Sequence, residues 1–193
     1  MIKVAFLDRD GVINTDLGYV HSKENFFFID GVINAMRRLN TLGYQIIIVT
    51  NQSGIGRGVF TEEQYQILTL WYKKFLESSG IFILDILYCP HFASSKNLEY
   101  AVDCKCRKPK PGMFDEAINR YQINLSSSFV VGDKLSDLIA GSNAGLNHGF
   151  LIDDSFSDNT IDFYELNRKS FKYRVVSDLH NCIKLLEKDD LHT

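Results

Sequence analysis

The chain has no apolar run long enough to cross a membrane, and it contains little proline. A membrane-spanning helix needs about 20 consecutive apolar residues, and no stretch of these 193 residues approaches that length. Three prolines, 45% apolar residues and 23% charged residues argue against a disordered chain. With no internal repeat to indicate a repeat array, we expect one domain over residues 1–193.

The sequence also lacks a strong excess of charge. Twenty-one Lys and Arg face 24 Asp and Glu, which leaves a formal net charge of −3. This balance disfavours nucleic acid and anionic membranes as partners. The apolar start, residues 1–7, stops at Asp8 and is too short for a secretion signal. We therefore expect a cytoplasmic monomer.

Short apolar runs alternate with longer amphipathic segments, which is typical of βα units in a parallel sheet. Strands are expected at residues 2–7, 44–49, 83–88, 128–131, 149–152 and 173–176. Helices are expected between an Asp30 cap and Gly43, after a capping box at Thr61, after Pro111, and over 134–144 and 178–188. The polar segment 154–172 is expected to be irregular. The predicted fold class is α/β, a Rossmann-like parallel sheet with helices on both faces.

Polar residues follow four of the predicted strands, in segments 8–11, 50–54, 89–91 and 132–134. One aspartate after a strand is most often only a turn or a helix cap. Four such strand ends meet at one edge of a parallel sheet, where ligands bind. Asp8 and Asp10 have the period-two spacing that lets both side chains face one way, and such a pair favours a divalent cation.

The same residues suit phosphoryl chemistry. A carboxylate can attack phosphorus and form an aspartyl-phosphate. Thr50, together with Lys108 or Lys134, could then position and neutralise the transferred group. Asp133 could complete a Mg²⁺ site.

Four ordered motifs resemble the signatures of the haloacid-dehalogenase-like (HAD-like) hydrolases, and the match covers residues 1–152. They are Asp8-Arg9-Asp10-Gly11-Val12-Ile13, Thr50-Asn51-Gln52-Ser53-Gly54, Arg107-Lys108-Pro109 and Gly132-Asp133-Lys134-Leu135-Ser136-Asp137. The resemblance implies the HAD fold and a phosphoric monoester hydrolase. It makes Asp8 the nucleophile and Asp10 the general acid and base, with Thr50 and Lys108 holding the phosphoryl group.

The resemblance also implies a Mg²⁺ site. Its ligands would be Asp8, the backbone carbonyl of Asp10, and Asp133. Asp137 lies one helical turn beyond Asp133 and is expected to support the metal site from outside.

Three cysteines and a histidine have a spacing that indicates a structural Zn²⁺ site. Cys89, His91, Cys104 and Cys106 form a closed set of four ligands within the loop 89–106. The alternative is a pair of reduced core cysteines beside a surface histidine. The polar residues between the ligands cannot order this loop by hydrophobic burial, so we favour zinc. Cys182 is expected to be an ordinary core residue.

The family resemblance extends to members that carry a zinc loop but no cap domain. Only residues 11–29 separate Asp10 from Asp30, which leaves no room for a cap, so a shallow pocket is expected. Such members act on heptose bisphosphates or on histidinol phosphate, and this chain looks more like the first group. It would then remove the 7-phosphate of D-glycero-D-manno-heptose 1,7-bisphosphate, in the supply of nucleotide-activated heptose. Expected substrate contacts are Asp16, Leu17, Gly18, Tyr19, Asn51, Gln52, Ser53, Arg57, Arg107 and Lys134.

Two alternatives remain open from the sequence. One is the same mechanism with another substrate, such as histidinol phosphate or, less favoured by the acidic balance, a nucleic-acid 3′-phosphate. The other is a non-catalytic binding module stabilised by zinc, against which the combined presence of Asp8, Asp10, Lys108 and Asp133 argues.

Overall fold

The computed structural model describes residues 1–155, 164–166 and 171–190, and its centre is one seven-stranded sheet with the order β3-β2-β1-β4-β5-β7-β6. Six strands run parallel: β1 (Val4–Leu7), β2 (Gln45–Asn51), β3 (Ile83–Cys89), β4 (Phe129–Gly132), β5 (His148–Ile152) and β7 (Lys172–Val176). The short β6 (Tyr164–Glu165) pairs with β7 in the antiparallel sense. The predicted α/β fold with a parallel sheet is confirmed.

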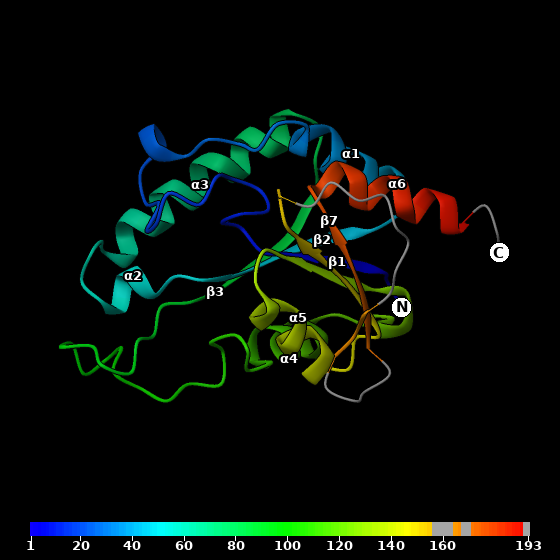
Figure 1. The fold of residues 1–193 in the computed structure, drawn as a ribbon. Coiled ribbons are helices and arrows are strands. Elements are labelled where there is room, and N and C mark those ends of the chain that lie inside the picture. The colour runs from blue at the N-terminus through cyan, green and yellow to red at the C-terminus, as the bar shows by residue number, and fades with distance from the viewer. Residues whose placement is uncertain (156–163, 167–170, 191–193) are drawn as a thin grey trace.

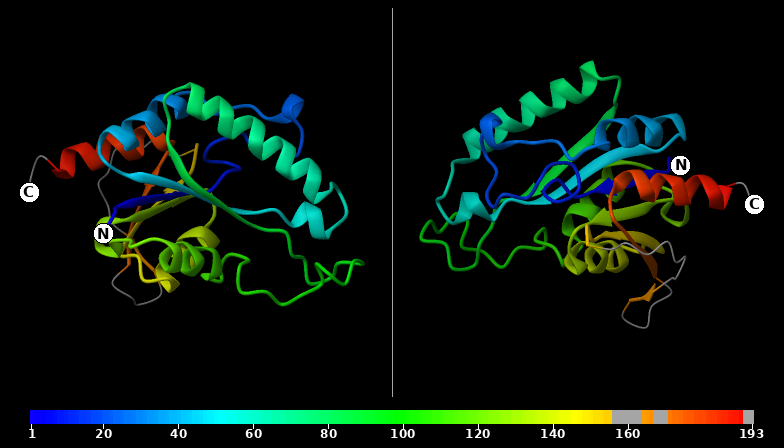
Figure 2. Two further views of the ribbon diagram at one scale, coloured as in Figure 1. Left: turned by 180° about the vertical axis from the view of Figure 1, so that it is seen from behind. Right: turned by 45° about the horizontal axis from the view of Figure 1, so that its top comes forward.

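Helices cover both faces of the sheet (Figures 1 and 2). α1 (Val32–Thr41), α3 (Glu62–Ser78) and α6 (Leu179–Asp190) lie on one face, and α4 (Gly112–Arg120) and α5 (Leu135–Asn143) lie on the other. Alternate residues of each strand enter two different cores: Leu7 packs into the core beneath α1, whereas Phe6 packs against Phe114 of α4. Burial on both faces explains why β1 and β4 are apolar throughout.

The helix starts follow the sequence signals only in part. The predicted capping box is present at the start of α3, where Thr61 and Gln64 bond reciprocally. The predicted Asp30 cap is wrong. The N-cap of α1 is Gly31, with φ +79° and no side-chain cap bond, so the chain enters this helix through a left-handed residue that glycine adopts easily.

Other segments differ in detail from the prediction. Pro111 precedes α4 as its N-cap rather than starting its first turn. A one-turn helix, α2 (Ser53–Gly56), follows β2, and no periodic pattern of apolar residues predicts it. β6 lies inside the segment 154–172, which was expected to be irregular, and residues 156–163 and 167–170 of that segment lie outside the described residues.

The strand order places β1 and β4 side by side in the middle of the sheet. The chain builds β1, β2 and β3 outward in one direction and then returns to place β4 on the other side of β1. Ligands of open α/β sheets bind at such a reversal, beyond the carboxyl ends of the strands. In the part of the chain that is described, no helix combines the length and apolarity required to traverse a bilayer.

Candidate active site

The carboxyl ends of β1, β2 and β4 surround a cavity of about 360 Å³. All four predicted catalytic residues line it: Asp8, Asp10, Thr50 and Lys108. The structure therefore brings together side chains that are up to 100 positions apart in the sequence. The cavity opens beside the β1–β4 reversal, as the topology requires.

Lys108 forms the buried centre of this cavity. Its ammonium lies 3.1 Å from Asp8 Oδ1 and 2.6 Å from Asp137 Oδ1, and it donates to the Val49 carbonyl oxygen at 2.7 Å. Burial disfavours the charged ammonium, but the charges of Asp8 and Asp137 outweigh it, so the pKa of Lys108 is raised. This lysine stays cationic beside Asp8, where it can neutralise a phosphoryl group.

Asp8 is nearly inaccessible to solvent and carries a penalty for its charge. Burial, with the nearby carboxylates of Asp137, Asp10 and Asp133, raises its pKa to about 7 against the opposing pull of Lys108. The backbone N–H of Arg9 donates to Asp8 Oδ1 at 2.7 Å and holds the carboxylate in place. A divalent cation beside Asp8 would relieve this penalty.

Three carboxylates are arranged to bind such a cation. Asp8, Asp133 and Asp137 each offer an oxygen, and these oxygens lie within 4.8 Å of one another. Among the described residues, Asp133 Oδ1 is buried without a hydrogen-bond partner. Buried, negatively charged oxygens in this number suit a hard cation such as Mg²⁺. The chemistry of these donors therefore fits the predicted metal.

Two glycines allow the carboxylates to approach. A Cβ at Gly11 would lie 2.6 Å from Asp133 Oδ2, and one at Gly132 would lie 2.3 Å from the Cβ of Asp137. Gly11 also has φ +81°, a conformation that other residues adopt only with strain. Both glycines of the predicted motifs are thus required by close packing around the carboxylates.

The carboxylate of Asp10 is not one of this group of three. Its Oδ2 accepts from Gln52 Nε2 at 3.0 Å, and the same amide nitrogen donates to Thr50 Oγ1 at 2.8 Å. Oδ1 accepts from Asn14, and Arg9 donates to both oxygens. The side chain of Asp10 therefore lies outside the metal cluster, which suits the expected contact through its backbone carbonyl.

Seven of the ten predicted substrate residues line the cavity, namely Asp16, Gly18, Tyr19, Asn51, Gln52, Ser53 and Lys134. Lys134 pairs with Asp133 at 2.9 Å and with Asp16 at 3.3 Å, so it ties the 16–19 loop to the end of β4. Asn51 exchanges two hydrogen bonds with the backbone of Lys108 at 3.1 and 3.2 Å. Its amide therefore positions the lysine as well as facing the cavity.

The other three predicted substrate residues lie outside the cavity lining. Leu17 is exposed at the loop tip. Arg57 stacks on the ring of Phe92 at 3.6 Å, and Arg107 donates to the carbonyl oxygen of His91 at 3.3 Å. Both arginines contact the 89–106 loop in this structure. Spacing along the sequence could not reveal these partners.

Three lining residues, Gly54, Ser136 and Asp137, were absent from the predicted catalytic and substrate-binding residues. Ser136 lies between Lys134 and Asp137 in the first turn of α5. Asp137 was expected to act from outside the metal site, but its oxygen lies among the three grouped carboxylates. The Gly132-Asp133-Lys134-Leu135-Ser136-Asp137 motif held the signal for Ser136 and Asp137, because its second half forms the N-terminus of α5, which lines the cavity.

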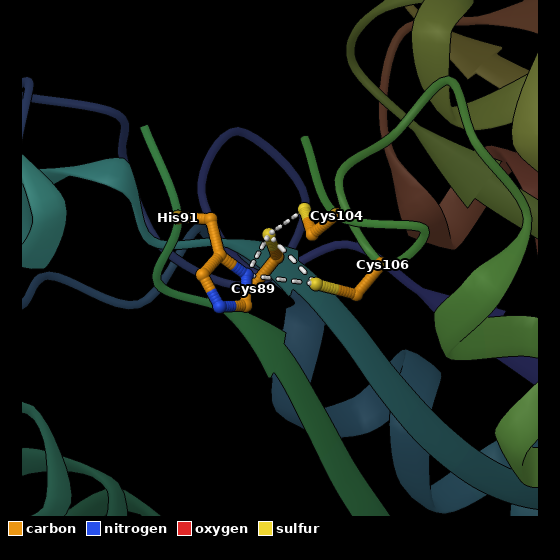
Figure 3. A group of neighbouring side chains, drawn as sticks. All are labelled: Cys89, His91, Cys104 and Cys106. Carbon is orange, nitrogen blue, oxygen red and sulfur yellow. Dashed lines mark hydrogen bonds between the residues drawn. The ribbon is translucent and has the colours of Figure 1, made fainter. Parts of the chain in front are cut away.

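The predicted zinc ligands form a second cluster (Figure 3). The side chains of Cys89, His91, Cys104 and Cys106 point toward one another, and their ligand atoms lie within 4.8 Å. Cys89 Sγ is 3.0 Å from Cys106 Sγ and 3.5 Å from Cys104 Sγ, while His91 Nδ1 is 3.2 Å from Cys106 Sγ. All four thiols of the chain are free, and Cys182 is buried apart from the cluster.

This cluster is compatible with tetrahedral zinc. Three sulfurs and one nitrogen are a common structural Zn²⁺ ligand set. The hydrogen bond between Cys106 and Cys89, followed by burial, raises the pKa of Cys106, so this thiol resists ionising without a nearby cation. A metal ion would supply the charge that lets it ionise.

The 89–106 loop is attached to the cavity wall through α2. The N–H of Gly56 donates to the Pro90 carbonyl oxygen at 3.0 Å, and a Cβ at Gly56 would lie 2.7 Å from that oxygen. Arg57 stacks on Phe92 beside this contact. The loop therefore packs against the segment that carries Ser53 and Gly54 at the cavity.

Comparison with known proteins agrees with this geometry. A family profile described as HAD-hydrolase-like matches residues 105–166. The D-glycero-alpha-D-manno-heptose-1,7-bisphosphate 7-phosphatase of Photorhabdus laumondii subsp. laumondii is 50% identical over 151 residues, covering 78% of this chain and 82% of the relative. The chain belongs to the family of HAD-like phosphatases, as its motifs indicated.

Further relatives carry related names. The D-glycero-beta-D-manno-heptose-1,7-bisphosphate 7-phosphatase of Pasteurella multocida is 48% identical over 152 residues, covering 79% of this chain and 82% of that protein. The crystal structure of D,D-heptose 1,7-bisphosphate phosphatase from B. bronchiseptica, complexed with magnesium and phosphate, has a TM-score of 0.80 and 28% identity. That match covers 97% of this chain and 99% of the other.

Proposed function

We propose that the protein is a Mg²⁺-dependent phosphatase that hydrolyses the 7-phosphate of D-glycero-D-manno-heptose 1,7-bisphosphate. The observation that carries this proposal is the buried cluster of Asp8, Lys108, Asp133 and Asp137 at the cavity. Relatives of 48–50% identity with this activity in their names support the substrate. The product would feed the synthesis of nucleotide-activated heptose.

The side chains divide the reaction into two displacements. A carboxylate oxygen of Asp8 attacks phosphorus while the bond to the sugar oxygen breaks, and that oxygen takes a proton from Asp10. Asp10 then accepts a proton from water as the water oxygen attacks phosphorus, which releases phosphate and regenerates Asp8. Thr50 and Lys108 hold the transferred group and balance its charge through both steps.

Two metal ions complete the proposal. Asp8, Asp133 and the backbone carbonyl of Asp10 would hold Mg²⁺, with Asp137 beside them, and the ion would supply charge neutralisation at the phosphoryl group. Zn²⁺ would be held by Cys89, His91, Cys104 and Cys106 in a purely structural role. Free cysteines suit the reducing cytoplasm, where we expect the protein to act as a monomer of one domain.

The substrate assignment is tested by phosphate release from a panel. The alpha and beta anomers of heptose 1,7-bisphosphate are compared with histidinol phosphate and a 3′-phosphorylated oligonucleotide, with and without Mg²⁺. We expect the highest kcat/KM on a heptose bisphosphate and no turnover without Mg²⁺. Higher kcat/KM on histidinol phosphate would overturn the substrate but leave the mechanism.

The mechanism is tested separately with Asp8→Asn. Loss of the nucleophile should lower kcat by at least about 10⁴-fold, since the covalent route is closed. Asp30→Asn, an exposed carboxylate near α1, is the matched control and should keep wild-type turnover. Phosphate release by Asp8→Asn at the parent rate would exclude the covalent mechanism.

A further inference from the structure

Arg9 lies between the two catalytic aspartates, yet the reaction as described does not use it. Its side chain is completely buried, which is rare for arginine, and its charge must be balanced inside the protein. The chain keeps a costly buried cation directly beside Asp10. A specific interaction must offset that cost.

The partner of this cation is the Asp10 carboxylate. Arg9 Nη2 donates to both carboxylate oxygens at 2.9 Å, and Nε donates to Oδ1 at 3.2 Å. A planar guanidinium that bonds two oxygens determines the orientation of the carboxylate plane as well as its position. An ammonium in the same place could hold the charge but not the plane.

The two oxygens of Asp10 have different surroundings. Oδ1 receives Arg9 Nε and Asn14 Nδ2, and Asn14 is fully buried and does not line the cavity. Oδ2 shares the Arg9 Nη2 donor with Oδ1, but its second donor is Gln52 Nε2, and Gln52 lines the cavity together with Thr50. Oδ1 is thus held on the inner side, and Oδ2 is the oxygen on the side of the substrate.

The guanidinium is itself held rigidly. Nη2 also donates to the Val20 carbonyl oxygen at 2.8 Å, and the guanidinium lies 5.9 Å from the centre of the Tyr65 ring. Tyr65 and Tyr72 are both fully buried on α3. Because α3, the 16–21 segment and Asp10 all contact it, Arg9 cannot easily change rotamer.

We propose that Arg9 is a positioning residue that orients the Asp10 carboxyl group so that Oδ2 transfers the proton. This inference rests on the proposed function, because Asp10 is the general acid and base of that reaction and Arg9 is the residue that orients it. When Asp10 is protonated, Oδ1 keeps the hydrogen bonds from Arg9 Nε and Nη2, and Oδ2, which receives only Nη2 from Arg9, carries the hydroxyl. As the bond between phosphorus and the leaving oxygen breaks, its electron pair stays on that oxygen, which takes the proton from Oδ2.

The test depends on how much each substrate needs that proton. An alkyl phosphate, such as a sugar phosphate, has a poor leaving group and requires protonation, whereas the p-nitrophenolate of p-nitrophenyl phosphate leaves without it. The ratio kcat/KM covers only the steps up to departure of the leaving group. Comparing kcat/KM for both substrates therefore isolates the acid function from the later hydrolysis of the phosphoenzyme.

Arg9→Met should lower kcat/KM for the sugar phosphate by about 10-fold to 100-fold, because positioned general acids contribute about 10²-fold to 10⁴-fold. For p-nitrophenyl phosphate we expect a loss below about 3-fold. Arg9→Lys keeps the charge without the two-oxygen contact and should show the same selectivity. Asn14→Ala removes one donor to Oδ1 and should produce a smaller selective loss even if the Arg9 variants fail to fold.

Two controls distinguish a positioning role of Arg9 from a general loss of stability. Leu39→Ala truncates the core under α1 and should lower stability without changing the ratio between the two substrates. In a double variant, Asp10→Asn should abolish the further effect of Arg9→Met, because the arginine acts through that carboxyl group.

The outcomes distinguish this inference from the proposed function. Equal losses on both substrates in folded Arg9→Met, Arg9→Lys and Asn14→Ala would overturn the positioning role while the wild type remains a phosphatase. A wild-type protein that hydrolyses neither substrate would overturn the proposed function itself.

Discussion

Gly11, which follows Asp10 in the first motif, determines how closely Asp133 can approach Asp8. A methyl group there would lie 2.6 Å from Asp133 Oδ2, well inside contact distance. We expect Gly11→Ala to push Asp133 outward and to raise the Mg²⁺ concentration for half-maximal activity by about 10-fold or more, since one displaced ligand weakens the site. Mg²⁺ titration of phosphate release measures this shift.

Gly58→Ala is the control for this prediction. Gly58 has a similar positive φ of +71°, but a Cβ there would meet no atom of the described residues within 4 Å. Both variants share a backbone strain of about 1–2 kcal/mol, so only the crowding of Asp133 differs. An equal Mg²⁺ requirement in the two variants would contradict the role assigned to Gly11.

Individual residues show where prediction from sequence stops. Thr50 and Asp133 were located because residue type and strand-end position together restrict their chemistry. Lys108 follows no strand, and the family resemblance of its motif selected it over Lys134. Arg57 was expected at the substrate because arginine binds phosphate well, but its partner in this structure is Phe92, 35 positions later in the chain. Long flexible side chains select partners by tertiary packing, which neighbouring sequence does not encode.

The 89–106 loop connects metal binding to the cavity through α2. We expect Cys106→Ala to lose zinc and to lower kcat/KM for the sugar phosphate by about 10-fold, because Gly56 and Arg57 would lose the ordered loop against which they pack. Zinc content by elemental analysis and kcat/KM by phosphate release measure both effects. Because Lys108 lies two positions after Cys106, loss of the ordered loop should also disturb Lys108 and lower kcat/KM further.

Cys182→Ala provides the matched control. Cys182 is a buried residue of α6, far from the cluster in the sequence, and its thiol contributes no ligand atom to the cluster. This variant should keep its zinc and its kcat/KM. If Cys106→Ala lost zinc but kept full kcat/KM, the loop would have no role at the cavity.

The helices and strands that could be predicted are those whose burial or capping leaves a clear pattern in the sequence. β1, β4 and the centre of β2 are apolar because both faces are covered, and α3 carries its capping box in four adjacent residues. β6 has two residues, and pairing with β7 defines it rather than any local pattern. α2 is a single turn, too short for a helical period to appear.

The molecule as a whole gathers its acidic groups where the sheet order reverses, and this arrangement opposes folding stability. β1 contributes Asp8, and the segment after β4 contributes Asp133 and Asp137, so three carboxylates share one partly buried space. Lys108 balances part of this charge. The remaining repulsion and burial are visible in the pKa of Asp8, which is raised to about 7.

The raised pKa predicts how stability depends on pH without Mg²⁺. Unfolded Asp8 loses its proton near pH 4, whereas folded Asp8 keeps it until about pH 7. Between these values the folded state binds more protons, so the free energy of unfolding falls as pH rises and then levels off. Three pKa units correspond to about 4 kcal/mol at most, and a loss on the order of 2 kcal/mol is expected after partial relaxation.

Asp8→Asn removes this titration and should abolish that part of the pH dependence. In Mg²⁺-free buffer, urea unfolding measures the free energy of unfolding of each protein. The difference in this free energy between Asp8→Asn and the wild type should shift in favour of the variant from pH 5 to pH 8. The exposed Asp30→Asn should show no such shift. Added Mg²⁺ should stabilise the wild type at pH 8 more than Asp8→Asn, because the ion compensates a charge that the variant lacks. A wild type and an Asp8→Asn variant whose stabilities change in parallel over this range would mean that Asp8 carries no burial penalty.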